Sequence, residues 1–295
     1  MGVLPHNVLA EWIDRFPHRR APRVDLPRKR EGKITAPVRL AHYSKGRTMQ
    51  KVLVENNADG TTLITINRPE RRNAICAETA LMLQKAFQDF ERSSTQRAAV
   101  LTGAGNEAFS GGADTGNFPE LWRCIPTVGF ETTKPIVSAV AGWCVGGALV
   151  LSMMCDLTVA AENAKFSYPE ARLGFTGGLI AGLAARIPHK VAMEMMLLCR
   201  ILDPQRAYTI GLVNDVVPTG QQVPVALKMA RELTEFSPLV LKTLKRFVTE
   251  GVLAHGPSEQ SGRAQRALCE VKESEDAVEA ASAVKEKRKA VFKGR

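Results

Sequence analysis

The sequence has no long uninterrupted apolar run. Its apolar stretches are broken by Lys, Asp or Gly before they reach the roughly eighteen residues that a helix needs to span a membrane. The first residues also lack the continuous hydrophobic segment and the small-residue cleavage site of a secretory signal peptide. We therefore expect no membrane association and no secretion signal.

Cysteine is scarce and shows no pairing pattern. The six cysteines have no CxxC spacing, and several fall in apolar runs, where a free cysteine behaves as a small hydrophobic residue. The five histidines are scattered as well, so the sequence predicts neither a metal site nor a disulfide framework. Unpaired cysteines are typical of a reducing compartment, and we expect a cytoplasmic protein.

The positive charge is unevenly placed along the chain. The formal net charge is +10, but residues 1–48 hold eleven Lys and Arg against four Asp and Glu, and the remaining residues hold 29 against 26. A mildly basic body suits an anionic small molecule as well as a polyanion. No stacking-aromatic pattern of a nucleic-acid module is present, so nucleic acid is not an expected partner.

The first 48 residues differ in composition from the rest. Segment 16–33 is rich in Pro and Arg and lacks periodicity, which predicts a basic, poorly ordered extension, and 7–16 can form a short amphipathic helix. The alternatives are a start codon assigned upstream of Met49, an arm that packs on a neighbouring subunit, and a mitochondrial-type presequence. The four acidic residues argue against the presequence.

From Lys51 onward, strand and helix patterns alternate. Segments 51–57 and 61–67 are β-rich runs joined by a turn containing Asp-Gly, which predicts a hairpin. Segment 76–93 has apolar residues at helical spacing. Further β-rich runs lie at 97–103, 135–142 and 156–162. This alternation predicts an α/β fold.

After Met193 the patterns become mainly helical. Asp203 followed by Pro204, and Ser237 followed by Pro238, are typical of an N-cap with proline in the first helical position. A last helix is expected over 274–292, because its acids come early and its bases late, as the helix dipole favours.

Six segments together resemble the crotonase superfamily, the enoyl-CoA hydratase/isomerase fold. They stand in the family's order as INRPERRNA (66–74), VLTGAGNEAFSGGAD (100–114), KPIVSAVAGWCVGGA (134–148), MMCDLTVAAENAKFSYPEARLG (153–174), AYTIGLVNDVVP (207–218) and SEDAVEA…EKRKAVFKGR (274–295). The resemblance implies a ββα spiral core over 49–195 that holds the acyl-CoA site. It also implies a helical region over 196–295 that trimerises, into a homotrimer or a dimer of trimers. The implied substrates are coenzyme A thioesters, with no permanently bound cofactor.

Two backbone N–H groups are implied as the electrostatic centre of the site. The resemblance assigns them to Ala113 and Gly147, where they would hold the thioester oxygen as negative charge forms on it. Gly112 and Gly146 allow the backbone to come close to the ligand. Gly147 also begins a helix, whose dipole favours negative charge. Taken alone, a Gly-Gly pair is more often a turn or a close-packing site.

The carboxylates depart from the family pattern. Hydratases of this family use two glutamates, and the matching positions here are Val150 and Glu170. Valine cannot orient water or move a proton, whereas a partly desolvated Glu170 would have a pKa raised toward the working pH. Taken alone, a Glu beside a Pro is more often a solvated loop residue.

A single carboxylate favours an isomerase-like reaction, in which Glu170 removes a proton from the acyl group and returns it elsewhere on the enolate. An enoyl-CoA hydratase, or a C–C lyase or decarboxylase acting on an acyl-CoA, is the enzymatic alternative. A non-catalytic binder with a basic tail is the alternative from another class.

The implied contacts with coenzyme A are cationic and backbone groups. Arg71 and Arg72 match the region that meets the phosphates, and Ala74 would lie near the adenine; an exposed turn with solvated arginines is the alternative. Other implied contacts are Gly112, Asp114, Thr115, Gly146 and Val150. Basic residues 287–289 can reach a phosphate, but a charged terminal helix is the favoured interpretation.

Two segments near the site also depart from the family. Segment 115–133 is short, which predicts an unusual acyl group, with Phe118, Trp122 and Phe130 as candidate liners or core residues. The chain after Gly174 lacks the family's Pro-Gly-x-Gly-Gly-Thr run. Asp156 is expected to end a helix or to satisfy backbone groups rather than to react.

Overall fold

A hairpin opens the part of the chain that the computed structural model describes, residues 50–295. Strand β1 (Val52–Asn56) pairs antiparallel with β2 (Thr61–Ile66), and Gly60 N–H closes the turn on the Asn57 carbonyl at 3.2 Å. The predicted hairpin is confirmed. The basic extension 1–48, with its expected helix at 7–16, lies outside the described residues.

The large sheet continues from this hairpin in parallel. Strands β3 (Ala98–Gly103), β5 (Ile136–Val140), β7 (Leu157–Ala161) and β9 (Asp215–Val217) give the order β1-β2-β3-β5-β7-β9. The first three match the predicted β-rich runs. Strand β9 lies in the range expected to be helical, so residues 196–295 contribute a strand to the core as well as helices.

A small parallel sheet alternates with the large one. It consists of β4 (Ala108–Ser110), β6 (Trp143–Val145) and β8 (Lys165–Ser167). Each of these follows a strand of the large sheet, and helices α3 (Gly147–Met153) and α4 (Glu170–Leu173) follow β6 and β8. Because parallel strands end at the same edge, the segments after β4, β6 and β8 meet there.

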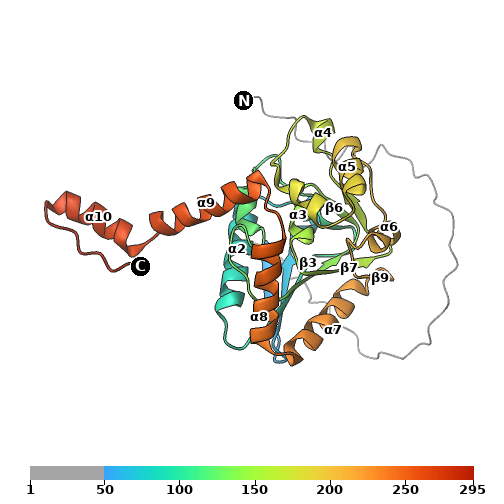
Figure 1. Ribbon diagram of the computed structural model, residues 1–295, viewed down its shortest axis with the longest axis horizontal. Coiled ribbons are helices and arrows are strands. Elements are labelled where there is room, and N and C mark those ends of the chain that lie inside the picture. The colour runs from blue at the N-terminus through green and yellow to red at the C-terminus, as the bar shows by residue number, and fades with distance from the viewer. Residues whose placement is uncertain (1–49) are drawn as a thin grey trace. The chain divides into compact units, whose positions relative to one another are not determined.

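Helices cover both faces of the large sheet (Figure 1). Helix α2 (Ala77–Arg92), predicted from its apolar spacing, buries Leu83, Phe87 and Phe90 in the main core, which also contains α3 and the inner face of the small sheet. Helix α7 (Gln222–Glu235) packs Ala226 and Ala230 against the other face, where Val100 and Val137 lie. The two cores reflect the alternation of side chains along each strand.

Shorter elements connect these layers: η1 (Pro69–Arg71), η2 (Leu121–Cys124), η3 (Leu179–Ala185), α5 (His189–Leu198) and α6 (Pro204–Thr209). At the start of α6 the Asp203 carboxylate accepts the Arg206 N–H at 2.8 Å, which confirms the predicted cap. Among residues 50–295, no helix combines the length and apolarity needed to traverse a bilayer.

The C-terminal helices are α8 (Pro238–Arg246), a π-helical turn η4 (Phe247–Val252), α9 (Pro257–Lys272) and α10 (Glu275–Glu286). Lys245 anchors α8 to the core, because its ammonium group lies 2.7 Å from Asp156 Oδ2. The same oxygen accepts the Ile136 N–H at 2.7 Å, so Asp156 satisfies a backbone group, as expected. Helix α9 contacts η2 and η3, and α10 follows it (Figure 1).

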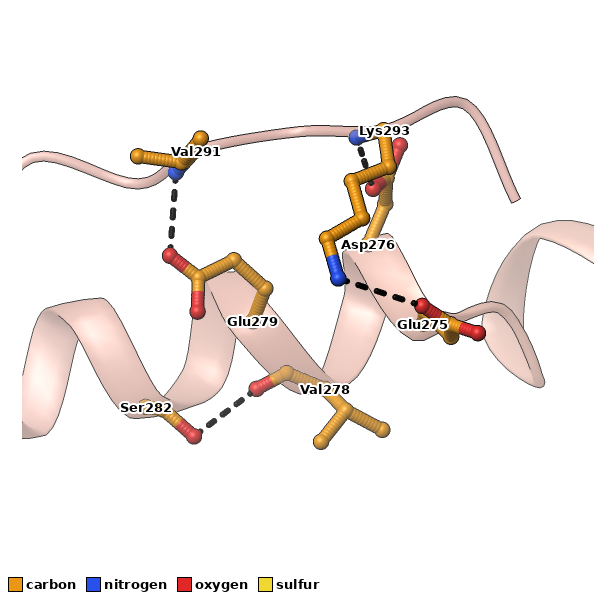
Figure 2. Close-up of a pocket in the computed structure, with 7 residues that line it drawn as sticks. All are labelled: Glu275, Asp276, Val278, Glu279, Ser282, Val291 and Lys293. Atoms are coloured by element: carbon orange, nitrogen blue, oxygen red, sulfur yellow. Dashed lines mark hydrogen bonds and ion pairs between the residues drawn. The ribbon is translucent and has the colours of Figure 1, made fainter.

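The last helix is shorter than predicted. It ends at Glu286, and Lys287 takes a left-handed conformation with φ 52°. The tail then folds back along α10, where the Asp276 carboxylate accepts the N–H groups of Lys293 and Gly294, and Glu279 accepts that of Val291. The hollow between helix and tail has a volume of about 330 Å³. Figure 2 shows the residues that line it. These acidic side chains bind the returning tail, whereas the charge pattern predicted that the helix continues to residue 292.

Candidate active site

The segment after β4 turns directly against the segment after β6. Gly112 has φ +88°, and a Cβ there would lie 2.6 Å from the Val145 carbonyl oxygen and 3.5 Å from the Gly147 nitrogen. Only glycine fits this close approach at positive φ. The structure therefore brings the two glycine pairs together, although they are far apart in the sequence.

The neighbours of Ala113 fix the direction of its N–H group. Ile75 N–H donates to the Gly112 carbonyl at 2.8 Å, and Asp114 N–H donates to the Ile75 carbonyl at 2.8 Å. In a trans peptide the C=O and N–H groups point in opposite directions, so the Ala113 N–H points away from Ile75. No backbone hydrogen bond found within residues 50–295 uses this N–H.

Gly147 presents its N–H group in a comparable way. Gly146 has φ +58° and donates to the Ser167 carbonyl at 2.9 Å, and its own carbonyl accepts the Val150 N–H at 3.2 Å. The Gly147 N–H therefore points opposite to α3, away from the helix interior. The Leu121 side chain covers the Gly147 Cα, which shields this turn with apolar atoms.

Glu170 begins α4 and its carboxyl group lies beside Gly146. A Cβ at Gly146 would be only 2.6 Å from Glu170 Oε1. The residue is 8% exposed, and Oε2 is buried without a hydrogen-bond partner among the described residues. Burial raises the pKa of this carboxyl group to about 8. A proton can therefore be held or released here near neutral pH.

The phenol of Tyr168 lies close enough to this carboxyl group to sense its charge, and Val150 is buried on α3. Val150, in the position of the family's first glutamate, is 2% exposed. Tyr168 is buried, and its hydroxyl group lies 2.7 Å from the hydroxyl oxygen of Thr176. Burial, and next the charge of Glu170, raise the pKa of Tyr168 to about 12, so the phenol stays protonated.

Asp114 is engaged by the protein itself. Its Oδ2 accepts from Arg68 Nη1 at 3.0 Å, and its Oδ1 accepts the Gly116 N–H at 3.1 Å. Burial raises the pKa of Asp114, but the Arg68 and Gly116 hydrogen bonds and the Arg68 charge outweigh it, and the net pKa is lowered. Sequence reasoning missed Arg68, whose only local signal is its place in INRPERRNA.

The residues expected to meet coenzyme A surround this ion pair. The Arg71 side chain is 58% exposed, with its guanidinium 3.8 Å from Asp114 Oδ1, and Thr115 is exposed. The Ala74 carbonyl accepts from Arg68 Nη1 at 2.5 Å. Arg72 is partly exposed and takes φ 50°. The two arginines thus lie on a turn beside the Ala113 segment.

The remaining candidates are dispersed. Arg288 is engaged by Glu279 and Glu286, but residues 287–289 lie beyond the end of α10, so the expected charged terminal helix does not include them. Phe130 belongs to the core, where it stacks on Phe87 with 4.7 Å between ring centroids. Phe118 is half exposed and meets Phe175 edge to face at 5.2 Å. Across residues 50–295, no three His, Cys, Asp or Glu side chains group as metal ligands.

Comparisons with known proteins identify a family that matches most of the chain. The family profile Enoyl-CoA hydratase/isomerase matches residues 56–295. The carnitinyl-CoA dehydratase of Salmonella enteritidis is 33% identical over 265 residues, covering 79% of this chain and 94% of that protein.

Solved structures of similar fold cover most of the chain. A carnitinyl-CoA dehydratase from Mycobacterium avium has a TM-score of 0.65 at 32% identity, covering 84% of this chain and all of the other. An enoyl-CoA hydratase from Mycobacterium tuberculosis has a TM-score of 0.63 at 30% identity, covering 83% and 99%. The predicted α/β crotonase fold is confirmed.

Proposed function

The chain belongs to the enoyl-CoA hydratase/isomerase family, and from that membership we propose that it moves a proton on an acyl-CoA thioester with Glu170 as its single carboxylate. The family acts on acyl groups carried by coenzyme A, so the chain is an acyl-CoA-processing enzyme. Membership also favours an enzyme over the non-catalytic binder with a basic tail.

The proposed step uses the two backbone N–H groups and the Glu170 carboxylate together. The N–H groups of Ala113 and Gly147 hydrogen-bond the thioester oxygen, and the Glu170 carboxylate takes a proton from the α-carbon of a 3-enoyl-CoA. The C–H electron pair forms a dienolate whose charge rests on that oxygen. Glu170 then returns the proton to the γ-carbon, and the double bond has moved from position 3 to position 2. No other reactant is needed.

The observation that carries this proposal is the environment of Glu170. Its buried carboxyl group lies against Gly146, the residue before the Gly147 amide, and Oε2 has no hydrogen-bond partner among the described residues. Val150, the residue that the resemblance matches to the family's first glutamate, cannot supply a second acid. One group must therefore act first as base and then as acid. A pKa of about 8 suits both roles, since neither protonation state is far from reach at neutral pH.

Dehydration is a second candidate function, favoured by the relatives named carnitinyl-CoA dehydratase. In this reaction Glu170 takes the α-proton of a 3-hydroxyacyl-CoA and donates it to the departing β-hydroxyl group. The products are water and a 2-enoyl-CoA. The first half is the same in both reactions, and the second half differs only in which atom receives the proton.

The substitution Glu170→Gln tests the proposal, with 3-hexenoyl-CoA and crotonyl-CoA assayed in parallel for isomerisation and hydration. We expect kcat to fall by roughly a hundredfold or more, the usual scale for loss of a general acid–base group. Glu162→Gln removes an exposed carboxylate at the end of β7 and serves as the control. Turnover by Glu170→Gln close to that of the control would remove Glu170 from the mechanism.

The pH dependence gives a second readout of the same step. Glu170 must be ionised to act as base, so kcat/KM for isomerisation should rise about tenfold per pH unit and level off above about 8. This profile should disappear in Glu170→Gln. A rate that falls as pH rises toward 8 would instead indicate that the protonated form reacts first.

We also propose that the chain works as a homotrimer or a dimer of trimers. Support comes from apolar side chains on α8 and η4 that are exposed in the single chain: Leu239, Val240, Leu244, Phe247 and Val248, with exposed fractions of 48% to 71%. A contiguous apolar stripe of this kind is typical of an interaction surface.

A further inference from the structure

The buried ion pair between Arg68 and Asp114 joins two segments that the proposed chemistry uses. Arg68 lies just before η1 and is 12% exposed at its side chain, and Asp114 is 7% exposed. One nitrogen, Arg68 Nη1, donates to Asp114 Oδ2 at 3.0 Å and to the Ala74 carbonyl at 2.5 Å. The guanidinium therefore holds the turn over residues 68–74 and the Ala113 segment against each other.

The pair acts on Ala113 through its immediate neighbours. Asp114 follows Ala113 directly, and its backbone N–H donates to Ile75. Gly112 precedes Ala113, and its carbonyl accepts from Ile75. With its side chain held by Arg68, Asp114 has both its backbone and its carboxylate fixed, and the peptide that carries the Ala113 N–H has little freedom to rotate.

Hydrogen bonds within the turn over residues 68–74 and to the neighbouring chain also fix the position of Arg68. Arg68 N–H donates to Asn73 Oδ1 at 3.0 Å, and the Asn73 amide nitrogen donates to the carbonyl groups of Ala104 and Ala108. Arg68 is thus held in place independently of Asp114. It provides a fixed reference to which the Ala113 segment is tied.

From this geometry we infer that Arg68 is a positioning residue that sets the direction of the Ala113 N–H group through Asp114. The inference rests on the proposed function, because it assumes that this N–H binds the thioester oxygen. Arg68 itself does not touch the reacting atoms. A lysine in its place would keep the charge but lose the planar, fixed donor geometry of the guanidinium.

The test compares Arg68→Met, Asp114→Asn and their double variant in the full chain. Misdirecting one donor should lower kcat by about ten- to a hundredfold, somewhat less than removing the donor outright. The double variant should be no slower than the worse single variant, because both residues act along one connection. Arg68→Lys should recover part of the lost rate.

Lys245→Met is the matched control, because Lys245 and Asp156 form another shielded ion pair that also bonds backbone groups. Lys245 lies on α8, and we expect Lys245→Met to lower the thermal stability without changing kcat of the folded protein. If Arg68→Met does not fold, Asp114→Asn decides the question, since it preserves side-chain shape.

A spectroscopic measurement separates positioning from stability. Hexanoyl-CoA labelled with ¹³C at the thioester carbonyl binds without reacting, and hydrogen bonds from the two N–H groups should shift its infrared carbonyl band to lower frequency. We expect a smaller shift in Arg68→Met and Asp114→Asn and an unchanged shift in Lys245→Met. An unchanged band and kcat in the Arg68 and Asp114 variants would overturn the inference.

The outcomes separate a failure of the positioning role from a failure of the proposed function on which it rests. If the unaltered protein turns over no acyl-CoA thioester, the proposed function fails. If it turns over substrate and Glu170→Gln abolishes this, but the Arg68 and Asp114 variants remain as fast as Lys245→Met, only the positioning role fails.

Discussion

Helices α3 and α8 both carry large apolar side chains but occupy opposite environments. All seven residues of α3 are buried, whereas α8 contains no buried residue. Helix α3 begins at Gly147 and packs against β6 and η3, while α8 exposes Leu239 at 71% and Leu244 at 58%. An apolar pattern in the sequence therefore predicts that a helix face will be buried. It does not say whether that face is buried within the same chain or against another molecule.

The largest combined loss of activity and stability is expected where α3 meets the Ala113 segment. In Gly112→Ala the new methyl group would meet the Val145 carbonyl oxygen at 2.6 Å, at a φ of +88° that side chains rarely adopt. Backbone cannot yield as a side-chain tip does, so we expect activity to fall at least about tenfold and stability by about 1–3 kcal/mol. Steady-state rates and thermal unfolding measure both.

Gly105→Ala is the control for this prediction. Gly105 has a similar φ of +79°, but nothing lies within 4 Å of the added methyl group. It therefore isolates the backbone cost from the crowding. Equal losses in the two variants would mean that contact between the two glycine turns is unimportant.

The next effect concerns the stability that Glu170 contributes beside the start of α3. The folded pKa of Glu170 is raised above its ordinary value of 4.5 to about 8, so between these values the folded protein keeps a proton that the unfolded chain releases. Stability due to this group is therefore full below the unfolded pKa and falls as pH rises toward 8.

Glu170→Gln should remove that pH-dependent loss. The variant should match the unaltered protein near pH 4.5 and exceed its stability by about 3 kcal/mol at pH 7, with no further gain above about pH 8. Denaturant unfolding at a series of pH values measures the difference. A difference that does not change with pH would show that the carboxyl group ionises normally.

The smallest effect on folding is expected on α8. Leu244→Asp changes an exposed residue, so the unfolding free energy of the single chain should change by less than about 0.5 kcal/mol. If the α8 stripe contacts a second copy, the same change should reduce the mass seen by light scattering. Lys242→Asp, also exposed on α8 but outside the stripe, is the control. An unchanged mass would contradict the proposed interface.

Local patterns predicted the elements well because their causes are local. The hairpin, α2, and the strands β3, β5 and β7 follow from periodicity and turn residues, and α6 begins at the predicted Asp203 cap. The end of α10 was wrong by several residues. Its charge pattern is helical, but Asp276 and Glu279 bind the returning tail instead.

The site was predictable only in part. The resemblance supplied Gly112, Gly147 and Glu170 as candidates, and the structure draws the segments that contain them together. Arg68 was missed because its partner Asp114 lies 46 residues away, a contact that no local pattern encodes. The placement of Phe130 in the core likewise depends on Phe87, a residue of α2.

The hydrogen bond from the Val150 backbone to the Gly146 carbonyl has a consequence for the origin of new activities. That bond orients the Gly147 amide and uses no side-chain atom of residue 150. A substitution at 150 can therefore add or remove an acid without redirecting the N–H group that we propose polarises the thioester. In such a scaffold, a change at one codon can alter the reaction while the N–H groups that stabilise negative charge stay in place.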